Sequence, residues 1–176
     1  HLSIRRQRQM CIRDSFNGVC SKPPTIMFAP ARRGWDGKEK DTLTNIRDNN
    51  QFVVNMVSES FAEKMVMCST DFDSNVDEFE ISGLNPIASD RINPPRLLES
   101  KVSFECELNQ IVEIGNSDAG SGFIVIGTVL LFHIDDEVYE NGHILLDKLE
   151  PIGRLAGNKY TRPSDVFEIS RKIKPK

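Results

Sequence analysis

Four cations gather in one polar segment and are the side chains best suited to chemistry in this sequence. In MFAPARRGWDGKEKDTLTNI, residues 27–46, an apolar run ends and is followed by Arg32, Arg33, Lys38 and Lys40. Guanidinium groups bind phosphate oxygens in pairs, and lysine adds a point charge. A helix beginning at Asp41 or Thr42 would add backbone N–H groups and the positive end of its dipole. The pattern fits a bound phosphate, and on chemistry alone a solvated loop remains the alternative.

The elements on either side of this segment would hold it in place. PPTIMFA, residues 23–29, is typical of a buried strand opened by two prolines. DTLTNIRDNN, residues 41–50, predicts a short helix with Asp41 or Thr42 as its N-cap and with Leu43 and Ile46 facing inward. QFVVNMVS then predicts a second strand. The cations therefore lie between a strand end and a helix start.

The rest of the chain predicts two more helices and then a long hairpin. Residues 58–70 favour a helix with a capping box of Ser60 and Glu63, and residues 76–84 favour a short helix that ends at Gly83. Residues 101–114 alternate with period two, which predicts a strand with one wet face. Residues 121–134 are apolar on both faces and should lie centrally. This order predicts an α+β fold with an antiparallel sheet, most simply a closed barrel with helices at its rim.

Composition excludes several classes of protein. The chain has 176 residues and a formal net charge of −4, which suits one soluble domain and argues against a general nucleic-acid binder. No apolar run approaches the roughly 20 residues that cross a bilayer, so we expect no membrane partner and a cytoplasmic location. Neither the four cysteines nor the three histidines show metal-ligand spacing, and no GxGxxG motif follows a strand. We therefore expect no metal site and no dinucleotide-binding fingerprint.

The first fifteen residues differ from the rest. HLSIRRQRQMCIRDS holds four arginines and one acid, and it lacks the apolar core of a signal peptide. A targeting segment or a basic arm would explain it. We favour a third interpretation, because RQMCIRDS resembles translated sequencing-adapter read-through. We therefore treat residues 1–15 as a non-native segment and residues 16–176 as one N-terminally truncated domain.

Several separate motifs together resemble one known family. FNGVCSKPPTIMFAPARR, KDTLTNI, FVVNMV, INPPRLLESKVSFECEL, IVIGTVLLFHIDD and IGRLAGNKYTR, spread over residues 16–162, are similar to those of the flavin reductase-like family. The resemblance implies an FMN-binding split β-barrel that is mainly antiparallel, with short helices at the rim. It also implies that the two strands with which the family opens, before FNGV, are missing here.

The resemblance also implies a set of site residues. It assigns the FMN phosphate to Arg32, Lys40, Asp41 and Thr42, with Asp41 capping the helix or orienting Lys40. Asn17 would lie on the flavin side of the barrel, and Arg154 and Tyr160 would approach the flavin. The backbone of Phe28, Ala29, Pro30 and Ala31 would line the isoalloxazine ring; Ala31 stands where many members carry serine.

The implied activity is an NAD(P)H-dependent flavin reductase that passes a hydride from a nicotinamide to flavin N5. FMN would be the cofactor and NADH or NADPH the co-substrate, and no protein acid or base is required, so we assign no catalytic residue. The resemblance further implies a homodimer and an oxygenase or another acceptor for the electrons. One alternative is an FMN-binding electron-transfer protein without NAD(P)H activity. Another is a truncated chain that no longer binds flavin.

Three further side chains have competing roles on sequence alone. Trp35 and Tyr160 could stack on a flavin ring, or Trp35 could cover a neighbouring subunit. His133, in LLFHIDD, is more simply a strand-end histidine near Asp135 and Asp136 than a catalytic group.

Overall fold

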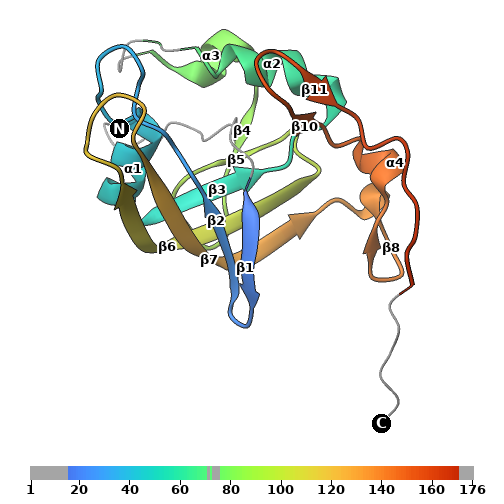
Figure 1. Cartoon of the computed structure of the whole chain (residues 1–176). Coiled ribbons are helices and arrows are strands. Elements are labelled where there is room, and N and C mark those ends of the chain that lie inside the picture. Colours follow the sequence, from blue (N-terminus) through green and yellow to red (C-terminus); the bar gives the residue numbers. More distant parts are fainter. Residues whose placement is uncertain (1–15, 71, 73–75, 171–176) are drawn as a thin grey trace.

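An antiparallel sheet of five strands dominates the structure, a computed structural model that describes residues 16–70, 72 and 76–170 (Figure 1). The expectation for residues 1–15 lies outside the described residues. The strands, in the order β1-β2-β7-β6-β3, are β1 (Asn17–Ser21), β2 (Pro24–Phe28), β7 (Gly122–Ile134), β6 (Val102–Ile114) and β3 (Gln51–Asn55). The apolar β7 is central, as predicted.

The described sheet does not close into a barrel, contrary to the simplest expectation. Its ladder ends at β1 on one side and at β3 on the other. The longest pairing joins β6 and β7 along their whole length and is interrupted by two register shifts, one of which lies between Glu105 and Cys106. The result is a strongly curved antiparallel sheet with two edges rather than a continuous ring (Figure 1).

The sheet curves around a core that α1 closes at one end. This core includes Phe28, Phe52, Val54 and Val125, all almost fully buried. Helix α1 (Asp41–Asn49) contributes Leu43 and Ile46, the two residues that its sequence predicted to face inward. Burying these two side chains contributes about 3–6 kcal/mol before entropy is counted. Packing of α1 on the sheet therefore fixes where its first turn lies.

Short elements complete the molecule. The helices at the rim are η2 (Glu59–Phe61), α2 (Ala62–Met67) and α3 (Glu78–Ser82), and further along the chain come η3 (Asp136–Val138) and α4 (Leu146–Leu149). Three small hairpins pair β4 (Pro86–Ile87) with β5 (Arg96–Leu97), β8 (Tyr139–Glu140) with β9 (His143–Ile144), and β10 (Gly153–Arg154) with β11 (Tyr160–Thr161). None of the described helices is both long and apolar enough to cross a membrane.

Two predicted helix starts were wrong, and one predicted end is confirmed. Ser60 lies inside η2 rather than capping a helix, because a 3₁₀ turn comes before α2. The N-cap of α1 is Lys40, not Asp41 or Thr42, and the Lys40 side chain makes no capping hydrogen bond. Helix α3 ends at Gly83 in the left-handed conformation, as its sequence predicted.

The register shift between β6 and β7 reverses which side chains of β7 point toward the core and which point outward. Before the shift, Val125 lies in the core, so Ile124 and Ile126 face outward. After it, Phe132 pairs with Phe104, and Ile134 pairs with Val102, which places both on the core side. Phe132 and Ile134 are nevertheless 46% and 38% exposed.

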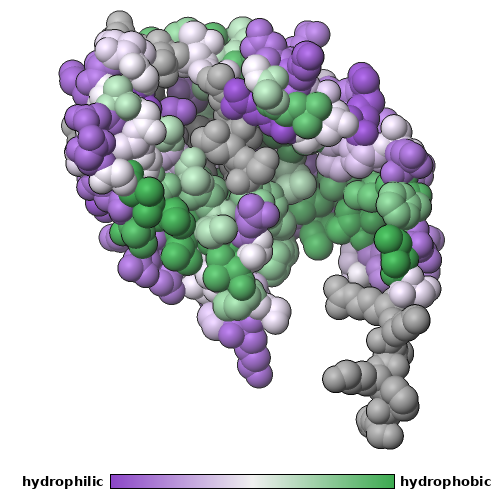
Figure 2. Space-filling view, viewed as in Figure 1, coloured by the Kyte–Doolittle hydropathy of each residue, from purple (hydrophilic) through white to green (hydrophobic). Residues whose placement is uncertain are grey.

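Other large apolar side chains in this part of the chain are exposed as well. Figure 2 shows hydrophobic atoms around a hollow between the β1–β2 hairpin and the arm that carries α4 and β8. The exposed large apolar residues of this part of the chain are Leu130, Phe132, Ile134, Tyr139 and Leu146. We call this set the β7–α4 surface.

Candidate functional site: the loop between β2 and α1

Backbone hydrogen bonds tie the segment after β2 to the start of β7. Arg32 donates its N–H to Ser121 O at 2.8 Å, and Phe123 donates to Pro30 O at 2.9 Å. Ala31 also forms a bridge with Gly122. A Cβ at Gly122 would lie 3.2 Å from Pro30 O, so the close approach of the two backbones favours glycine there. The first half of the loop is therefore an extension of the sheet.

The mostly buried side chain of Arg32 pairs with two more exposed carboxylates. Its Nη2 atom lies 2.7 Å from Glu113 Oε1 and 3.7 Å from Glu39 Oε1, and its side chain is 13% exposed. Its guanidinium also lies over the Phe123 ring, 4.8 Å from the centroid. Hydrogen bonds from Ser117 and Arg32, together with the charge of Arg32, lower the pKa of Glu113. Glu113 therefore stays ionised at neutral pH and competes for Arg32 with any bound anion.

A further cation of the loop, Lys40, stands at the start of α1. Lys40 is the N-cap residue, is half-buried, and forms no ion pair with another residue in the described part of the chain. Asp41 and Thr42 follow in the first turn, where the helix dipole is positive. Because Lys40 supplies no side-chain cap, an anion there would satisfy backbone N–H groups that this end of the helix presents.

The loop fits a phosphate with one adjustment. Lys40, Thr42 and the start of α1 offer an ammonium group, a hydroxyl and backbone N–H groups, which are donors that an anion can use. The Nε atom of Arg32 is buried without a hydrogen-bond partner among the described residues, which is a donor that an incoming oxygen could use. Arg32 would, however, have to exchange part of its contact with Glu113 for the anion.

The remaining residues expected on the flavin side lie near the same end of the sheet or on β1. Phe28 is buried against the Phe52 ring, at 5.6 Å between centroids, so only its backbone is available to a ligand. Pro30 is buried, whereas Ala29 and Ala31 are exposed. Asn17 is exposed on β1 and pairs with Met27 of β2.

Arg154 and Tyr160 belong to a different part of the molecule. They pair with each other across the β10–β11 hairpin. The chain leading into this hairpin is attached near the end of β3, because Ile152 donates its N–H to Val57 O at 3.2 Å. In Figure 1 the hairpin lies beside α2, on the opposite side of the view from α1. A single chain thus does not bring these two residues to the β2–α1 loop.

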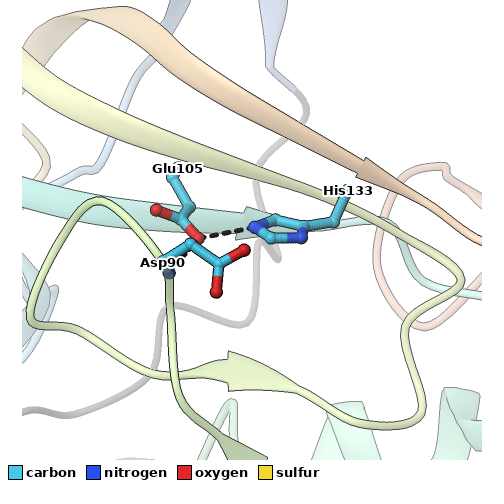
Figure 3. Close-up of side chains that lie close together, drawn as sticks. All are labelled: Asp90, Glu105 and His133. Carbon is cyan, nitrogen blue, oxygen red and sulfur yellow. Dashed lines mark hydrogen bonds and ion pairs between the residues drawn. The ribbon is translucent and has the colours of Figure 1, made fainter.

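A buried polar cluster on the outer face of the sheet was missed in the sequence. Glu105 was expected on the wet face of its strand, yet it is completely buried beneath the segment between β4 and β5. Its two oxygens accept N–H groups from Asp90 at 2.8 Å and Arg91 at 2.7 Å. His133 Nε2 lies 2.5 Å from Glu105 Oε1, as Figure 3 shows, so the partner of this histidine is Glu105 rather than Asp135 or Asp136.

The environment of Glu105 keeps it ionised. Burial alone would raise the pKa of this carboxyl, but the hydrogen bonds from Asp90, His133 and Arg91 and the charge of His133 together lower it. The Nε atom of Arg96 is also close, at 3.8 Å from Glu105 Oε1. Asp90, Glu105 and His133 are residue types that bind metals, and one potential ligand atom of each lies within 4.8 Å of those of the other two. Donors of the chain already use both oxygens of Glu105, so the cluster is built as an anchor for the β4–β5 segment.

Comparison with known proteins agrees with this fold. The model of the flavin reductase like domain matches residues 4–151. A protein of Aquifex aeolicus is 39% identical over 148 residues, which cover 84% of this chain and 72% of that protein. The protein YwrF of Bacillus subtilis is 34% identical over 160 residues, covering 89% of this chain and 77% of YwrF.

Solved structures show the same architecture. Nitrilotriacetate monooxygenase component B from Bacillus cereus superposes with a TM-score of 0.82 at 33% identity, covering 88% of this chain and 76% of its own. The 2-nitrobenzoate 2-nitroreductase NbaA of Pseudomonas fluorescens superposes with a TM-score of 0.76 at 31% identity, covering 89% of this chain and 74% of NbaA. A split-barrel-domain protein of Shewanella frigidimarina superposes with a TM-score of 0.77 at 21% identity, covering 90% of this chain and 76% of that protein. At this low identity, the likeness shows the fold alone. This chain, with its mainly antiparallel sheet and short rim helices, belongs to the flavin reductase-like family.

Proposed function

We propose that the protein binds FMN and reduces it with NADH or NADPH. The observation that carries the proposal is the cationic loop between β2 and α1, which is tied to β7 and ends at an uncapped helix start in a chain of this family. A dianionic phosphate matches both the cations and the helix dipole.

In this proposal each site residue has a definite task. Lys40, Thr42 and the first turn of α1 hold the FMN phosphate, and Arg32 joins them after releasing Glu113. Asp41 orients Lys40, since Lys40 and not Asp41 is the N-cap residue. The backbone from Phe28 to Ala31 and the side chain of Asn17 lie along the isoalloxazine ring and the ribityl chain.

Bound flavin would supply the redox chemistry, as the two-electron acceptor at N5 of a hydride from C4 of the dihydronicotinamide. The chain's own residues bind both molecules, align their rings and exclude water. We assign no side chain a proton-transfer role.

The relatives suggest where the electrons go next. Component B of nitrilotriacetate monooxygenase belongs by its name to an oxygenase system, and it is 33% identical to this chain. We therefore propose that reduced flavin serves a partner oxygenase or another diffusible acceptor. Nucleic acid and membranes are not proposed as partners.

A homodimer is part of the same proposal. The β7–α4 surface leaves five large apolar side chains exposed, and a second copy could cover them with the same surface. Arg154 and Tyr160 lie away from the β2–α1 loop of their own chain, so they would reach a flavin from a neighbouring copy. The site would then be built by two chains.

Anaerobic stopped-flow absorbance separates the reductase from its main alternative. Protein saturated with FMN is mixed with NADH or NADPH, and bleaching of the flavin bands is followed. Bleaching whose rate saturates with the nucleotide supports the reductase. Bound flavin that stays yellow with both nucleotides would instead indicate an electron-transfer protein that is reduced by a protein partner. Failure to bind FMN at all would reject both.

A further inference from the structure

Trp35 occupies an unusual position for the only tryptophan of the chain. It is 69% exposed, although tryptophan is a large apolar residue that proteins usually bury in good part. It stands in the turn between Arg33 and Lys38, inside the β2–α1 loop. Among the described residues, Trp35 is not part of the hydrophobic cluster that the sheet and α1 form.

The turn that carries Trp35 is well fixed by its own hydrogen bonds. Arg33 N–H donates to Lys38 O at 2.9 Å, and Gly37 N–H donates to Arg33 O at 2.9 Å. Arg32 Nη1 donates to Gly37 O at 3.3 Å, which packs the turn onto the proposed phosphate residue. Gly37 has a φ of +68°, and a Cβ there would lie 3.5 Å from Ala119 N in the β6–β7 hairpin loop. Trp35 is therefore presented on a defined scaffold.

A cation accompanies the exposed ring. The guanidinium of Arg33 lies 5.1 Å from the centroid of the Trp35 ring, and Arg33 also pairs with Asp36 at 3.2 Å. The Nε atom of Arg33 is buried without a hydrogen-bond partner among the described residues. Lys38 adds an exposed cation beside the turn. The surface thus combines an aromatic face, an unused donor and positive charge, which suits a ligand with a flat ring and phosphate groups.

We infer that Trp35 and Arg33 bind the adenosine diphosphate half of the nicotinamide dinucleotide. The inference rests on the proposed function and goes beyond it, because it places the end of the reductant that does no chemistry. If the nicotinamide stacks on the isoalloxazine ring, the two molecules can run side by side, and the adenosine end then lies near the FMN phosphate. That phosphate is assigned to Arg32 and Lys40, which flank the Trp35 turn in sequence. Adenine stacks on Trp35, and its phosphates meet Arg33 and Lys38.

The kinetic test compares Trp35→Ala with Trp35→Phe, using the FMN-loaded protein. Loss of base stacking should raise KM for the dinucleotide by about tenfold, while kcat and FMN affinity stay unchanged. Trp35→Phe keeps an aromatic face and should stay within about threefold of the parent. Reduced nicotinamide mononucleotide lacks the adenosine part, so its KM should be the same in all three proteins. An unchanged dinucleotide KM in Trp35→Ala, or an equal rise for the mononucleotide, would overturn the inference.

A binding test keeps this inference separate from the reductase proposal. ADP-ribose has no nicotinamide and cannot reduce flavin, and the fluorescence of the single tryptophan reports on Trp35 alone. Saturable quenching by ADP-ribose, weakened in Arg33→Ala, supports the site even if neither nucleotide bleaches the flavin. No quenching, or an emission shift that depends only on protein concentration, would assign Trp35 to a subunit contact and reject the site. Comparing 5′-ADP with 2′,5′-ADP shows whether Arg33 and Lys38 favour the extra phosphate of NADPH.

Discussion

Arg32 is shared between its own chain and the anion we propose for it. Its bond to Glu113 is charge-assisted, and the same guanidinium is near Glu39. A phosphate entering the loop must therefore compete with at least one carboxylate. In the proposed site, this competition would lower the FMN affinity below what the number of cations alone implies.

Removing that competitor should strengthen FMN binding. In Glu113→Gln, the hydrogen bond to Arg32 can remain but the negative charge is gone. We expect the FMN dissociation constant to fall about fivefold, corresponding to about 1 kcal/mol, with no change for riboflavin. Isothermal titration measures both, and Glu140→Gln on β8 serves as a charge-matched control. Weaker FMN binding in Glu113→Gln would show that Glu113 supports the site rather than competing for Arg32.

Glu105 is a residue whose importance is structural. Glu105→Gln places an amide NH₂ group against donors that now face a carboxylate, and it weakens the anchoring of the β4–β5 segment. We expect a loss of about 3 kcal/mol in the free energy of unfolding at neutral pH. Glu107→Gln, at an exposed position on the same strand, should change stability by less than about 0.5 kcal/mol. Urea unfolding compares the two variants.

The same pair of proteins gives a pH dependence with a defined sign. The pKa of Glu105 in the folded state lies below its ordinary value of 4.5, so its contribution is present above that value and is lost as pH falls. The stability difference between the parent and Glu105→Gln should therefore be largest at neutral pH and shrink below about pH 4.5. A difference that stays constant down to pH 3, or grows on acidification, contradicts this account of the cluster.

At the scale of elements, sequence patterns predict the features that depend on residues close together in the chain. The long strand β6, the central position of the apolar β7, and the inward positions Leu43 and Ile46 of α1 are confirmed. The wet face predicted for β6 is wrong in the first half of the strand, where Ser103 and Glu105 are buried. The register shift beside Glu105 and the burial of Glu105 were not predictable in this way. They depend on residues 88–97 folding over the outer face of the sheet, which is a long-range contact that leaves no periodic signal.

The site was predictable to a similar extent. The cations of the β2–α1 loop are visible in the sequence because strand end and helix start lie on either side of them. The partners of Arg32 were not, because Glu113 is 81 residues away and reaches it only through the pairing of β6 with β7. The N-cap was misassigned because Asp41 and Thr42 are better capping residues than Lys40.

Gly127 shows how tightly the central strand packs on the core. A Cβ at this position would lie 2.4 Å from Cζ of Phe52 and 3.2 Å from Glu107 O. Gly127→Ala should therefore lower the free energy of unfolding by about 1–3 kcal/mol, because the buried Phe52 ring must move. A Cβ at Gly18 on β1 would meet no atom within 4 Å, so Gly18→Ala should leave stability nearly unchanged. Equal urea midpoints for the two variants would mean that the sheet and Phe52 can separate without cost.

At the scale of the whole molecule, the β7–α4 surface argues for a partner copy. Light scattering of the FMN-loaded protein at micromolar concentration should give twice the mass of one chain. Leu146→Glu on α4 places a charge on that surface and should shift the equilibrium toward monomer, whereas Leu98→Glu, at a more exposed leucine on another segment, should not. A parent protein that remains a monomer while holding FMN tightly would reject the shared site.

The central claim is that the cations of the β2–α1 loop hold the phosphate of FMN, and the most direct measurement compares FMN with riboflavin. Each charged hydrogen bond contributes about 1.5–3 kcal/mol, so Arg32→Ala/Lys40→Ala should weaken FMN by roughly a hundredfold or more. Riboflavin lacks the phosphate, and its affinity should change by less than about threefold. Lys22→Ala/Lys148→Ala, which removes two exposed lysines elsewhere, should leave both affinities as they are. Equal losses of FMN and riboflavin affinity in Arg32→Ala/Lys40→Ala would contradict the assignment.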